Sequence, residues 1–351
     1  MLNFYKGKKV FITGHTGFKG TWLCRILLRA GAKVTGYALE PFTKPSLFIQ
    51  TNTENNIHSI IEDIKNRNIL EKAMREANPD IVFHMAAQPL VRLSYREPAL
   101  TYETNVMGTV NVLEAVRLTS SVRSFVNVTT DKVYENKEWY WGYRENENLC
   151  GYDPYSNSKS CSELVTYSYR NSFFSDKNTP VISTARSGNV IGGGDYSEDR
   201  IIPDCIRAME NGTEIIVRNP HSIRPYQHVL ECLYGYLLLA EKQYNDKTLQ
   251  GAYNFGPDSE NCVTSEILVN LFCDAWGKGA VWKIQGDGGP FEAGFLKLDC
   301  SKAKNVLGWK PFWDINTAVK KVVEFAKICT DNERLICIDK QIKEYFGEIN
   351  V

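Results

Sequence analysis

The chain has 351 residues, of which 43% are hydrophobic and 23% are charged, the ordinary balance of a soluble globular protein. Lys and Arg together number 41, as do Asp and Glu, so the formal net charge is zero. A nucleic-acid-binding protein normally has an excess of basic residues, and this composition argues against such a partner. No run reaches the roughly eighteen apolar residues that a membrane span requires. The N-terminus has no signal-peptide core, which argues against a membrane or secreted location.

The cysteines and histidines do not suggest a metal site or a disulfide framework. The ten Cys include no C-x-x-C pair, and the five His are dispersed along the chain. Zinc sites and disulfide-rich domains normally show clustered or regularly spaced ligands. We therefore expect a cytoplasmic protein that holds no metal.

The first half of the chain alternates short apolar runs with helical stretches. The pattern predicts strands over residues 9–13, 32–38, 80–84 and 122–130, and a first helix over residues 22–30. Such alternation is typical of a parallel sheet with right-handed crossovers. The predicted fold is α/β, a Rossmann-type doubly wound parallel sheet with a smaller mixed α/β substrate-binding lobe.

The regular alternation weakens after about residue 190, where Gly, Pro and aromatic residues become denser. We expect residues 1–190 to form a dinucleotide-binding domain, with a later segment, roughly 225–255, returning to it. Residues 191–351 would then form an interleaved substrate-binding lobe. Ordered loops over a site are expected at residues 192–194, 218–227 and 286–294.

A glycine-rich turn lies between the first predicted strand and the first predicted helix. Gly14, Gly17 and Gly20 occur in the stretch Thr13–Gly20 (TGHTGFKG). Glycines at these places permit a tight turn and a close approach to a pyrophosphate, which the N–H groups at the helix start can bind. A loop that needs glycine only for turning is the alternative, but the placement between strand and helix favours dinucleotide binding. Thr16 and Phe18 belong to the same candidate cofactor site.

The choice between NAD and NADP depends on the end of the second strand. The carboxylate expected there is missing, and Glu40 comes slightly late. No Arg is present to bind a 2′-phosphate, so the sequence favours NAD. Asp63, after the third strand, could hold the adenine amino group, or it could cap a helix.

A phenol and an ammonium group lie four residues apart at Tyr155 and Lys159. On a helix the two side chains share one face, and a nearby cation favours the phenolate that a general base requires. Any Tyr and Lys can have this spacing by chance, and the glycine-rich turn upstream favours a catalytic pair. Thr130 ends a predicted strand and can supply the hydroxyl that completes the set.

The acidic residue after Thr130 distinguishes between reactions. The turn G-x-x-G-x-x-G and the Tyr–Lys pair resemble the extended short-chain dehydrogenase/reductase superfamily, and the following Asp131 resembles its sugar-nucleotide 4,6-dehydratases. In that family the Asp protonates the departing 6-hydroxyl, a role that epimerases do not need. Most such dehydratases continue with a Glu that removes the C5 proton. Lys132 at that position resembles the CDP-glucose branch.

The resemblance to the CDP-glucose 4,6-dehydratase family covers nearly the whole chain. It implies NAD as cofactor and the conversion of CDP-glucose to CDP-4-dehydro-6-deoxyglucose and water, within the synthesis of deoxysugars of bacterial surface polysaccharides. The stretches with this resemblance are residues 10–20 (VFITGHTGFKG), 36–48 (GYALEPFTKPSLF), 84–98 (HMAAQPLVRLSYREP), 130–136 (TDKVYEN), 141–145 (WGYRE), 186–195 (RSGNVIGGGD), 218–229 (RNPHSIRPYQHV) and 252–257 (AYNFGP).

The resemblance also implies positions that contact cofactor and substrate. Those on the nicotinamide side of the cofactor are Ala86, Ala87 and Gln88, which follow the fourth strand. Those implied for the nucleotide-hexose are Asn189, near the phosphate-linked sugar, and Arg224, for the diphosphate. A fork of five donors suits a phosphate. Arg200 and Arg218 are further candidates, or members of surface ion pairs.

Three alternatives remain open from the sequence. A nucleotide-sugar epimerase would share Tyr155 and Lys159. A dehydratase acting on GDP-mannose or dTDP-glucose would share the chemistry but not the base pocket. A protein that only senses a dinucleotide would tend to lose the Tyr–Lys pair. Helices near residues 99–117 and 153–174 resemble the pair that forms the dimer interface of this superfamily, and this implies a homodimer.

Overall fold

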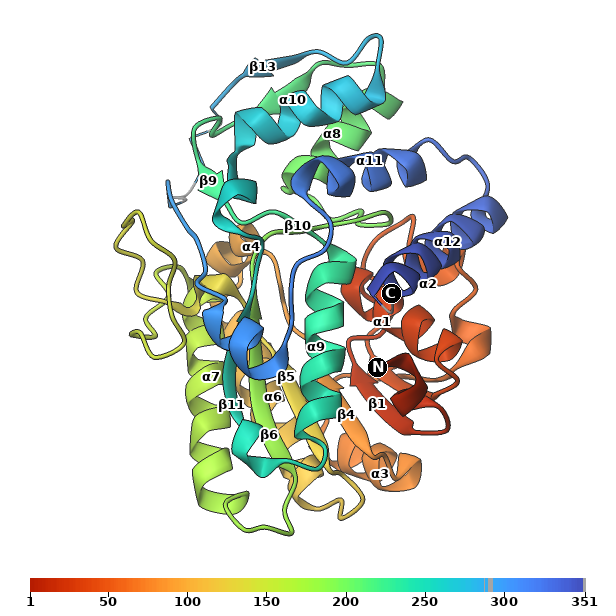
Figure 1. Cartoon of the computed structure of the whole chain (residues 1–351), viewed down its shortest axis with the longest axis vertical. Helices are drawn as coiled ribbons and strands as arrows, with labels where there is room; N and C mark the ends of the chain where they lie inside the picture. Colours follow the sequence, from red (N-terminus) through yellow and green to blue (C-terminus); the bar gives the residue numbers. More distant parts are fainter. Residues whose placement is uncertain (287, 290–292, 350–351) are drawn as a thin grey trace.

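The structure, a computed structural model, describes residues 1–286, 288–289 and 293–349, so the expected loop over residues 286–294 lies partly outside it. A seven-stranded sheet in the order β11-β6-β5-β4-β1-β2-β3 forms its centre, and all neighbouring strands are parallel (Figure 1). The predicted Rossmann-type parallel sheet is confirmed. The strands are β1 (Lys9–Thr13), β2 (Lys33–Ala38), β3 (His58–Ile61), β4 (Ile81–His84), β5 (Ser124–Val128), β6 (Val181–Ser187) and β11 (Gly251–Phe255).

Apolar side chains project from both faces of this sheet, and helices cover both faces. Along β1, Val10 and Ile12 belong to one buried cluster, whereas Phe11 belongs to the other. The first cluster packs against α1 and α9, and the second against α3 and α6. Strands β4 and β5 are buried throughout, as a sheet covered on both faces requires.

The helices connect the strands and cover the sheet (Figure 1). Helices α5 and α6 are joined by a π-helical turn, Glu103–Met107. The helices are α1 (Phe18–Arg29), α2 (Leu47–Gln50), α3 (Arg67–Ala77), α4 (Val91–Arg96), α5 (Pro98–Tyr102), α6 (Gly108–Arg117), α7 (Pro154–Phe173), α8 (Ile201–Glu210), α9 (Val229–Gln243), α10 (Ser265–Trp276), α11 (Ile315–Ala326) and α12 (Asp331–Ile349).

Two predicted boundaries are wrong in an informative way. Helix α1 begins at Phe18, four residues before the predicted start, because it follows directly on Gly17 at the end of the glycine-rich turn. The strand predicted over residues 122–130 ends at Val128. The Thr129 amide still donates to the Ala185 carbonyl oxygen at 2.9 Å, but the chain then turns into a short 3₁₀ helix, so Thr130 leaves the sheet.

A third buried cluster lies away from the sheet, between α8, α10 and α11. Figure 1 shows these helices above the carboxyl ends of the strands, where they form the smaller lobe. Three short strand pairs belong to this part: β7 (Val190–Ile191) with β10 (Gln227–His228), β9 (Ile223–Arg224) with β12 (Val263–Thr264), and β8 (Ile215–Val217) with β13 (Trp282–Ile284).

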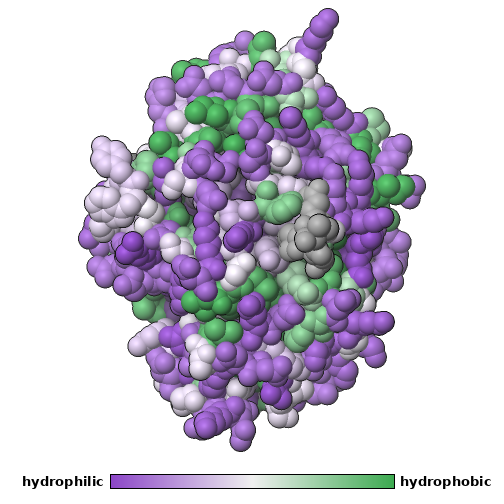
Figure 2. Space-filling model, in the orientation of Figure 1, coloured by the Kyte–Doolittle hydropathy of each residue, from purple (hydrophilic) through white to green (hydrophobic). Residues whose placement is uncertain are grey.

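In the part of the chain that the structure describes, no helix is both long and apolar enough to cross a bilayer. Figure 2 shows a surface on which hydrophobic patches are scattered among hydrophilic residues. Within the same described ranges, no three His, Cys, Asp or Glu side chains are grouped so that they could hold a metal ion.

Candidate active site

The glycine-rich turn has the close approaches that the sequence predicts. Gly14 has φ +79°, and a Cβ atom there would lie 2.7 Å from the amide nitrogen of Ala86. A Cβ atom at Gly20 would lie 2.1 Å from the Gly14 carbonyl oxygen. Gly17 is the N-cap of α1 and offers no capping side chain, so the first N–H groups of the helix remain available to an anion.

The end of β2, next to this turn, lacks the carboxylate that usually holds the adenosine ribose. The Thr16 hydroxyl donates to the Leu39 carbonyl oxygen at 2.8 Å, which joins the turn to the end of β2. The His15 ring packs on Gly36, where a Cβ atom would lie only 2.3 Å from the ring. His15 also hydrogen-bonds the Ser59 hydroxyl at 2.7 Å. The imidazole therefore fills space beside β2, and Glu40 is exposed beyond it.

Asp63 follows β3, as expected, at the same carboxyl edge of the sheet. One of its carboxylate oxygens accepts from the Lys65 amide at 2.9 Å, so Asp63 stabilises a local turn. The N-cap of α3 is Asn66. The alternative that Asp63 caps this helix is therefore wrong, because the helix begins three residues later than that alternative requires.

Tyr155 and Lys159 lie on the first turns of α7, which begins at Pro154 and is capped by the Asp153 carboxylate. The Lys159 ammonium donates to the Val128 carbonyl oxygen at 3.2 Å. Burial and, to a smaller extent, the nearby charge of Lys19 lower the pKa of Lys159 to about 7, against the opposing charge of Glu163. An ammonium with this pKa is only partly charged at neutral pH.

The expectation that the pKa of Tyr155 is lowered by Lys159 is wrong. Burial raises the pKa of the Tyr155 phenol to about 12, although hydrogen bonding to Thr130 and the charge of Arg200 oppose the rise. The reason is that the phenol is desolvated while its cationic neighbour is itself partly neutral.

Asp131 and Thr130 meet at the end of β5. The Thr130 hydroxyl donates to one Asp131 carboxylate oxygen at 2.9 Å, and the other oxygen is buried with no hydrogen-bond partner among the described residues. Burial raises the pKa of Asp131, although Lys132, Thr130 and Arg224 oppose the rise. A Cβ atom at Gly188 would lie 2.6 Å from the unpaired oxygen, so glycine is needed there. A buried carboxyl with a raised pKa suits a proton donor.

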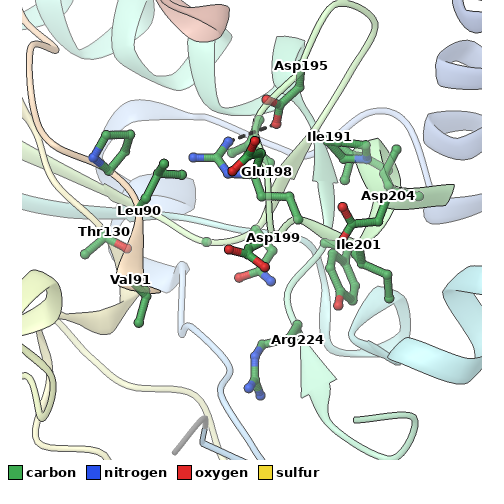
Figure 3. A pocket seen from close by; sticks show the side chains of 18 of the residues that line it. Leu90, Val91, Thr130, Ile191, Asp195, Glu198, Asp199, Ile201, Asp204 and Arg224 are labelled. Atoms are coloured by element: carbon green, nitrogen blue, oxygen red, sulfur yellow. Dashed lines mark hydrogen bonds and ion pairs between the residues drawn. The ribbon is translucent and has the colours of Figure 1, made fainter. Parts of the chain in front are cut away.

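One pocket brings half of the predicted site residues together, and Lys159 is not among the residues that line it (Figure 3). Leu90, Val91 and Thr130 lie on one side of the view, and Asp195, Glu198 and Asp199 lie across from them. The predicted residues that line it are Phe18, Thr130, Asp131, Lys132, Tyr155, Asn189, Arg200, Arg218 and Arg224.

The three pocket arginines that the sequence predicts as substrate ligands already have partners inside the protein. Arg200 pairs with Asp195 at 2.9 Å, and Arg218 pairs with Asp199 at 2.8 Å. Arg224 is buried, and its guanidinium donates to the carbonyl oxygens of Ile223, at 3.0 Å, and Ala293. The ion pairs foreseen for Arg200 and Arg218 are therefore present, but they lie in the pocket wall.

The segment after β4 contributes less than its sequence position suggests. In this segment the pocket lining begins at Pro89 and does not include Ala86, Ala87 or Gln88, and the Ala86 backbone lies against Gly14 of the glycine-rich turn. The Gln88 side chain donates to the Thr101 hydroxyl at 2.9 Å and accepts from the Leu90 amide at 2.6 Å. Gln88 therefore shapes the loop that carries the pocket wall.

Two features of the site were missed from the sequence. Glu163, one turn beyond Lys159 on α7, forms a buried ion pair with Arg186 at 2.8 Å. Its spacing on the helix face of Tyr155 and Lys159 is a signal that could have identified it. Lys19, between the second and third glycines of the turn, also lines the pocket.

A parallel doubly wound sheet, a glycine-rich turn at the start of α1 and a Tyr–Lys pair beside it define a short-chain dehydrogenase/reductase of the extended type. The model of the GDP-mannose 4,6 dehydratase family matches residues 11–322. The chain belongs to this family of nucleotide-sugar 4,6-dehydratases.

One relative resembles the chain closely in sequence, and two solved structures share its fold. The chain is 49% identical to CDP-glucose 4,6-dehydratase of Salmonella typhimurium, over 98% of each chain. Among solved structures, UDP-glucuronic acid 4-epimerase from Bacillus cereus, in complex with UDP-glucuronic acid and NAD, has TM-score 0.78 at 22% identity, with 91% of this chain and 98% of that one covered. dTDP-glucose 4,6-dehydratase from Bacillus anthracis, in complex with NAD, has TM-score 0.74 at 20% identity, with 90% and 95% covered.

Proposed function

We propose that the protein converts CDP-glucose to CDP-4-dehydro-6-deoxyglucose and water, with NAD retained in the site. The observation that favours a dehydratase over an epimerase is Asp131, a buried carboxyl with a raised pKa in the same pocket as Tyr155. The name of the Salmonella typhimurium relative supports CDP-glucose as the substrate.

The cradle at the start of α1 fits NAD. Side chains at Gly14 and Gly20 would clash with the backbone of Ala86 and of Gly14, so the turn keeps its tight shape, and Gly17 leaves the helix N–H groups uncapped for a pyrophosphate. We propose that Thr16 and Phe18 complete this part, that Asp63 contacts the adenine amino group, and that Ala86, Ala87 and Gln88 border the nicotinamide side. Bound NAD would supply the acceptor for a hydride from C4 of the hexose and would return that hydride to C6, while a proton returns to C5.

The chain's own residues then have separate proton-transfer roles. Tyr155 takes the proton of the 4-hydroxyl, supported by Thr130 and by Lys159. The ketone at C4 makes the C5 proton more acidic, so a modest base suffices. Asp131 donates its proton to the 6-hydroxyl as water leaves. Each well-placed acid or base contributes on the order of 10²–10⁴-fold to the rate.

Lys132 is the proposed base for the C5 proton, or it positions that base. It follows Asp131 in the short 3₁₀ helix and lines the same pocket. Its ammonium has no hydrogen bond or ion pair with the residues that the structure describes. Since an ammonium must lose its proton before it can act as a base, closure of the pocket over the substrate would have to desolvate Lys132.

The diphosphate of the substrate is proposed to bind beside the arginines of the pocket. Arg224 would contact the diphosphate, Asn189 the sugar next to it, and Arg200 and Arg218 the remaining phosphate oxygens. Arg200 and Arg218 now pair with Asp195 and Asp199, so substrate would compete with these carboxylates for the guanidinium groups.

Incubation with a panel of nucleotide-hexoses tests the proposed function. CDP-glucose should lose one water without added reductant, as measured by mass spectrometry, and UDP-glucose, dTDP-glucose and GDP-mannose should not. Deuterium placed at C4 of CDP-glucose should appear at C6 of the same molecule. Faster reaction of dTDP-glucose or GDP-mannose would favour one of the other dehydratases, and inversion at C4 without loss of water would favour an epimerase.

A matched pair of variants separates the first and second steps. Tyr155→Phe removes the ionisable hydroxyl, so oxidation at C4 should fall by at least ~10²-fold and no near-ultraviolet absorbance of reduced cofactor should appear. Asp131→Asn retains the shape but cannot donate the proton, so oxidation should occur and this absorbance should build up. Full dehydratase activity in Asp131→Asn would contradict the role of Asp131.

We also propose a homodimer formed by α7 together with the segment from α5 to α6. These helices expose large apolar side chains that a partner could cover: Leu100, Tyr102, Met107, Leu164, Tyr167 and Phe173. Light scattering of the purified protein tests this proposal, and Leu164→Glu should shift a dimer toward monomer.

The division of the chain and its location remain proposals. We propose that residues 1–190, with residues 225–255, form the NAD-binding unit, and that the rest of 191–351 forms the substrate lobe. The position of β11 in the large sheet supports the return of the later segment. A cytoplasmic location is supported by ten cysteines that are all free.

A further inference from the structure

Asp199 lines the pocket and connects two arginines from separate parts of the chain. Figure 3 shows it near the middle of the view, between Asp195 and Arg224. Its Oδ1 atom accepts a hydrogen bond at 2.8 Å from Arg218, which follows β8 in the smaller lobe. The same oxygen lies 3.6 Å from Nε of Arg92 on α4, which follows β4 of the large sheet. One carboxylate therefore joins two parts of the pocket wall.

The two aspartates that pair with pocket arginines differ in how firmly they are held. The Asp195 side chain is only 4% exposed, and it accepts a hydrogen bond from the Ser197 amide at 3.1 Å in addition to its pair with Arg200. The Asp199 side chain is 39% exposed, and its carboxylate pairs with guanidinium groups. Of the two, Asp199 is the one that a ligand can displace without breaking a bond to the local backbone.

The surroundings of Asp199 also reduce the cost of moving it. Its φ is +58°, in the left-handed region that few residues other than glycine adopt. Arg218 donates to the Asp199 carbonyl oxygen at 3.3 Å as well as to the carboxylate, and such contacts keep a residue in an unfavourable conformation. Burial raises the pKa of Asp204, and the charge of Asp199 adds to the rise, so the two carboxylates repel each other.

We propose that the Asp199 carboxylate occupies the place of one substrate phosphate, and that Arg92 and Arg218 together bind this phosphate once Asp199 is displaced. A guanidinium group forms paired, charge-assisted hydrogen bonds with phosphate as it does with carboxylate, so the exchange leaves both arginines with an anion. It also lets Asp199 leave its left-handed conformation. The inference rests on the proposed function, which brings the diphosphate to Arg218, and it adds Arg92 as a binding residue.

The buried arginine of the pocket, Arg224, binds in a different way. Its guanidinium donates to the carbonyl oxygens of Ile223 and Ala293, and it forms no ion pair with the residues that the structure describes. A phosphate can therefore bind beside Arg224 without displacing a carboxylate. A nucleoside monophosphate, which has a single phosphate, would bind there and leave Asp199 in place.

The consequence for the reaction is a site that releases its nucleotide readily. Substrate and product have the same diphosphate, so arginines that bound it without a competitor would also retain the product. Asp199 weakens the binding of every ligand that must displace it, because only the fraction of molecules in which Asp199 is displaced can accept the phosphate. It also provides both arginines with a counter-anion when the product leaves.

Calorimetry of CDP and CMP binding tests the proposal without turnover. Asp199→Asn keeps the shape of the side chain, and Asn adopts the left-handed conformation readily. CDP binding should become about tenfold tighter, since a hydrogen bond from a guanidinium group to an amide is weaker than one to a carboxylate. CMP binding should stay unchanged. Asp199→Gly removes the side chain at a backbone angle that glycine adopts without strain, so it should tighten CDP binding at least as much.

Three further variants separate displacement from a general effect of charge. Glu198→Gln removes the same charge from the neighbouring position, which lines the pocket without an ion pair to the described residues. It should change CDP binding by less than ~2-fold, because water and salt screen an exposed charge. Arg92→Met should weaken CDP binding and leave CMP binding unchanged. Asp199→Asn added to Arg218→Met should tighten CDP binding less than it does alone, because the exchange requires Arg218.

Equal tightening of CDP and CMP in Asp199→Asn would overturn the inference and leave Asp199 as a charge that repels all anions. Weaker CDP binding in both Asp199 variants would also overturn it and make Asp199 a direct ligand of the nucleotide. If the wild type dehydrates CDP-glucose but neither Asp199 variant changes CDP binding, the inference fails and the proposed function stands. A wild type that neither binds CDP nor dehydrates CDP-glucose would contradict both.

Discussion

Two charged residues on α7, Lys159 and Glu163, lie one turn apart and have opposite surroundings. Both are buried, and both contact the carboxyl end of β5 or the residue after it. The Glu163 carboxylate is fully paired, through Arg186, Thr129 and Thr184. The Lys159 ammonium has a single carbonyl oxygen, that of Val128, as acceptor. A step of four residues along one helix therefore separates a structural charge from a functional one.

The Glu163 side is satisfied in every direction. Its carboxylate accepts two hydrogen bonds from Arg186, at 2.9 and 2.8 Å, and one from each hydroxyl of Thr129 and Thr184, at 2.5 and 2.7 Å. Burial raises the pKa of Glu163, but Arg186 and these hydroxyls outweigh it and hold the pKa below its usual range. This cluster joins α7 to β6 and to the end of β5, directly before Thr130.

The surroundings of Lys159, in contrast, leave its charge without a direct ion pair. Among the described residues neither Lys159 nor Lys19 forms a direct ion pair, although carboxylates farther away raise the pKa of both, and one Asp131 oxygen has no hydrogen-bond donor. Unpaired buried charge destabilises a fold, and it is retained where a ligand or a reaction needs it. Glu163 and Lys159 are both buried, but only Glu163 is fully paired. In this protein, therefore, the presence of hydrogen-bond and ion-pair partners distinguishes structural charges from catalytic ones better than burial does.

The largest expected effect comes from breaking the satisfied side. Arg186→Met leaves the Glu163 carboxylate buried without its cation, which should reduce the free energy of unfolding by about 3–5 kcal/mol. Urea denaturation measures this loss. The double variant with Glu163→Gln should recover part of it, because no charge is then left unpaired. A loss below ~1 kcal/mol in Arg186→Met would contradict the structural role of the pair.

An effect of opposite sign should follow from removing the unsatisfied charge. Lys159→Met should raise the free energy of unfolding at pH 7 by about 1–3 kcal/mol, since a desolvated ammonium is replaced by an apolar chain of similar length, while turnover falls by at least ~10²-fold. A variant less stable than the wild type would show that the bond to Val128 outweighs desolvation.

The gain in the free energy of unfolding in Lys159→Met should decrease as the pH rises. The pKa of Lys159 is about 7 in the folded protein and ~10.4 in the unfolded chain, so folding releases a proton between these values. The destabilisation by Lys159 is fully present below pH 7 and is relieved as the pH rises toward 10. The stability difference between Lys159→Met and the wild type should therefore shrink over this range, and a constant difference would contradict the lowered pKa.

The smallest effect is expected at a charge pair that is neither buried nor in the pocket. Arg144 pairs with Asp299 at 2.9 Å, but its side chain is 71% exposed. Arg144→Ala should change the free energy of unfolding by less than ~0.5 kcal/mol, because water and salt screen such pairs. A change comparable to that of Arg186→Met would show that exposure does not distinguish the two pairs.

Local pattern was enough to predict much of the fold and part of the site. The apolar run at residues 9–13 matches β1 in full, because a buried parallel strand needs an unbroken apolar stretch. The glycine spacing and the Tyr155–Lys159 spacing are likewise local, and the structure brings Tyr155 together with Thr130 and Asp131 in one pocket. Helix starts and strand ends were less accurate, as at Phe18 and Val128.

The sequence by itself therefore determined the parallel sheet, the dinucleotide turn and the order of the catalytic residues, since each follows from neighbours a few positions apart. Only the tertiary structure decided which charges are paired. Arg186 reaches Glu163 across 23 positions, and Lys19 comes within electrostatic reach of Lys159 across 140. Burial and distance set the pKa of such groups, and both depend on how α1, α7 and the sheet pack together.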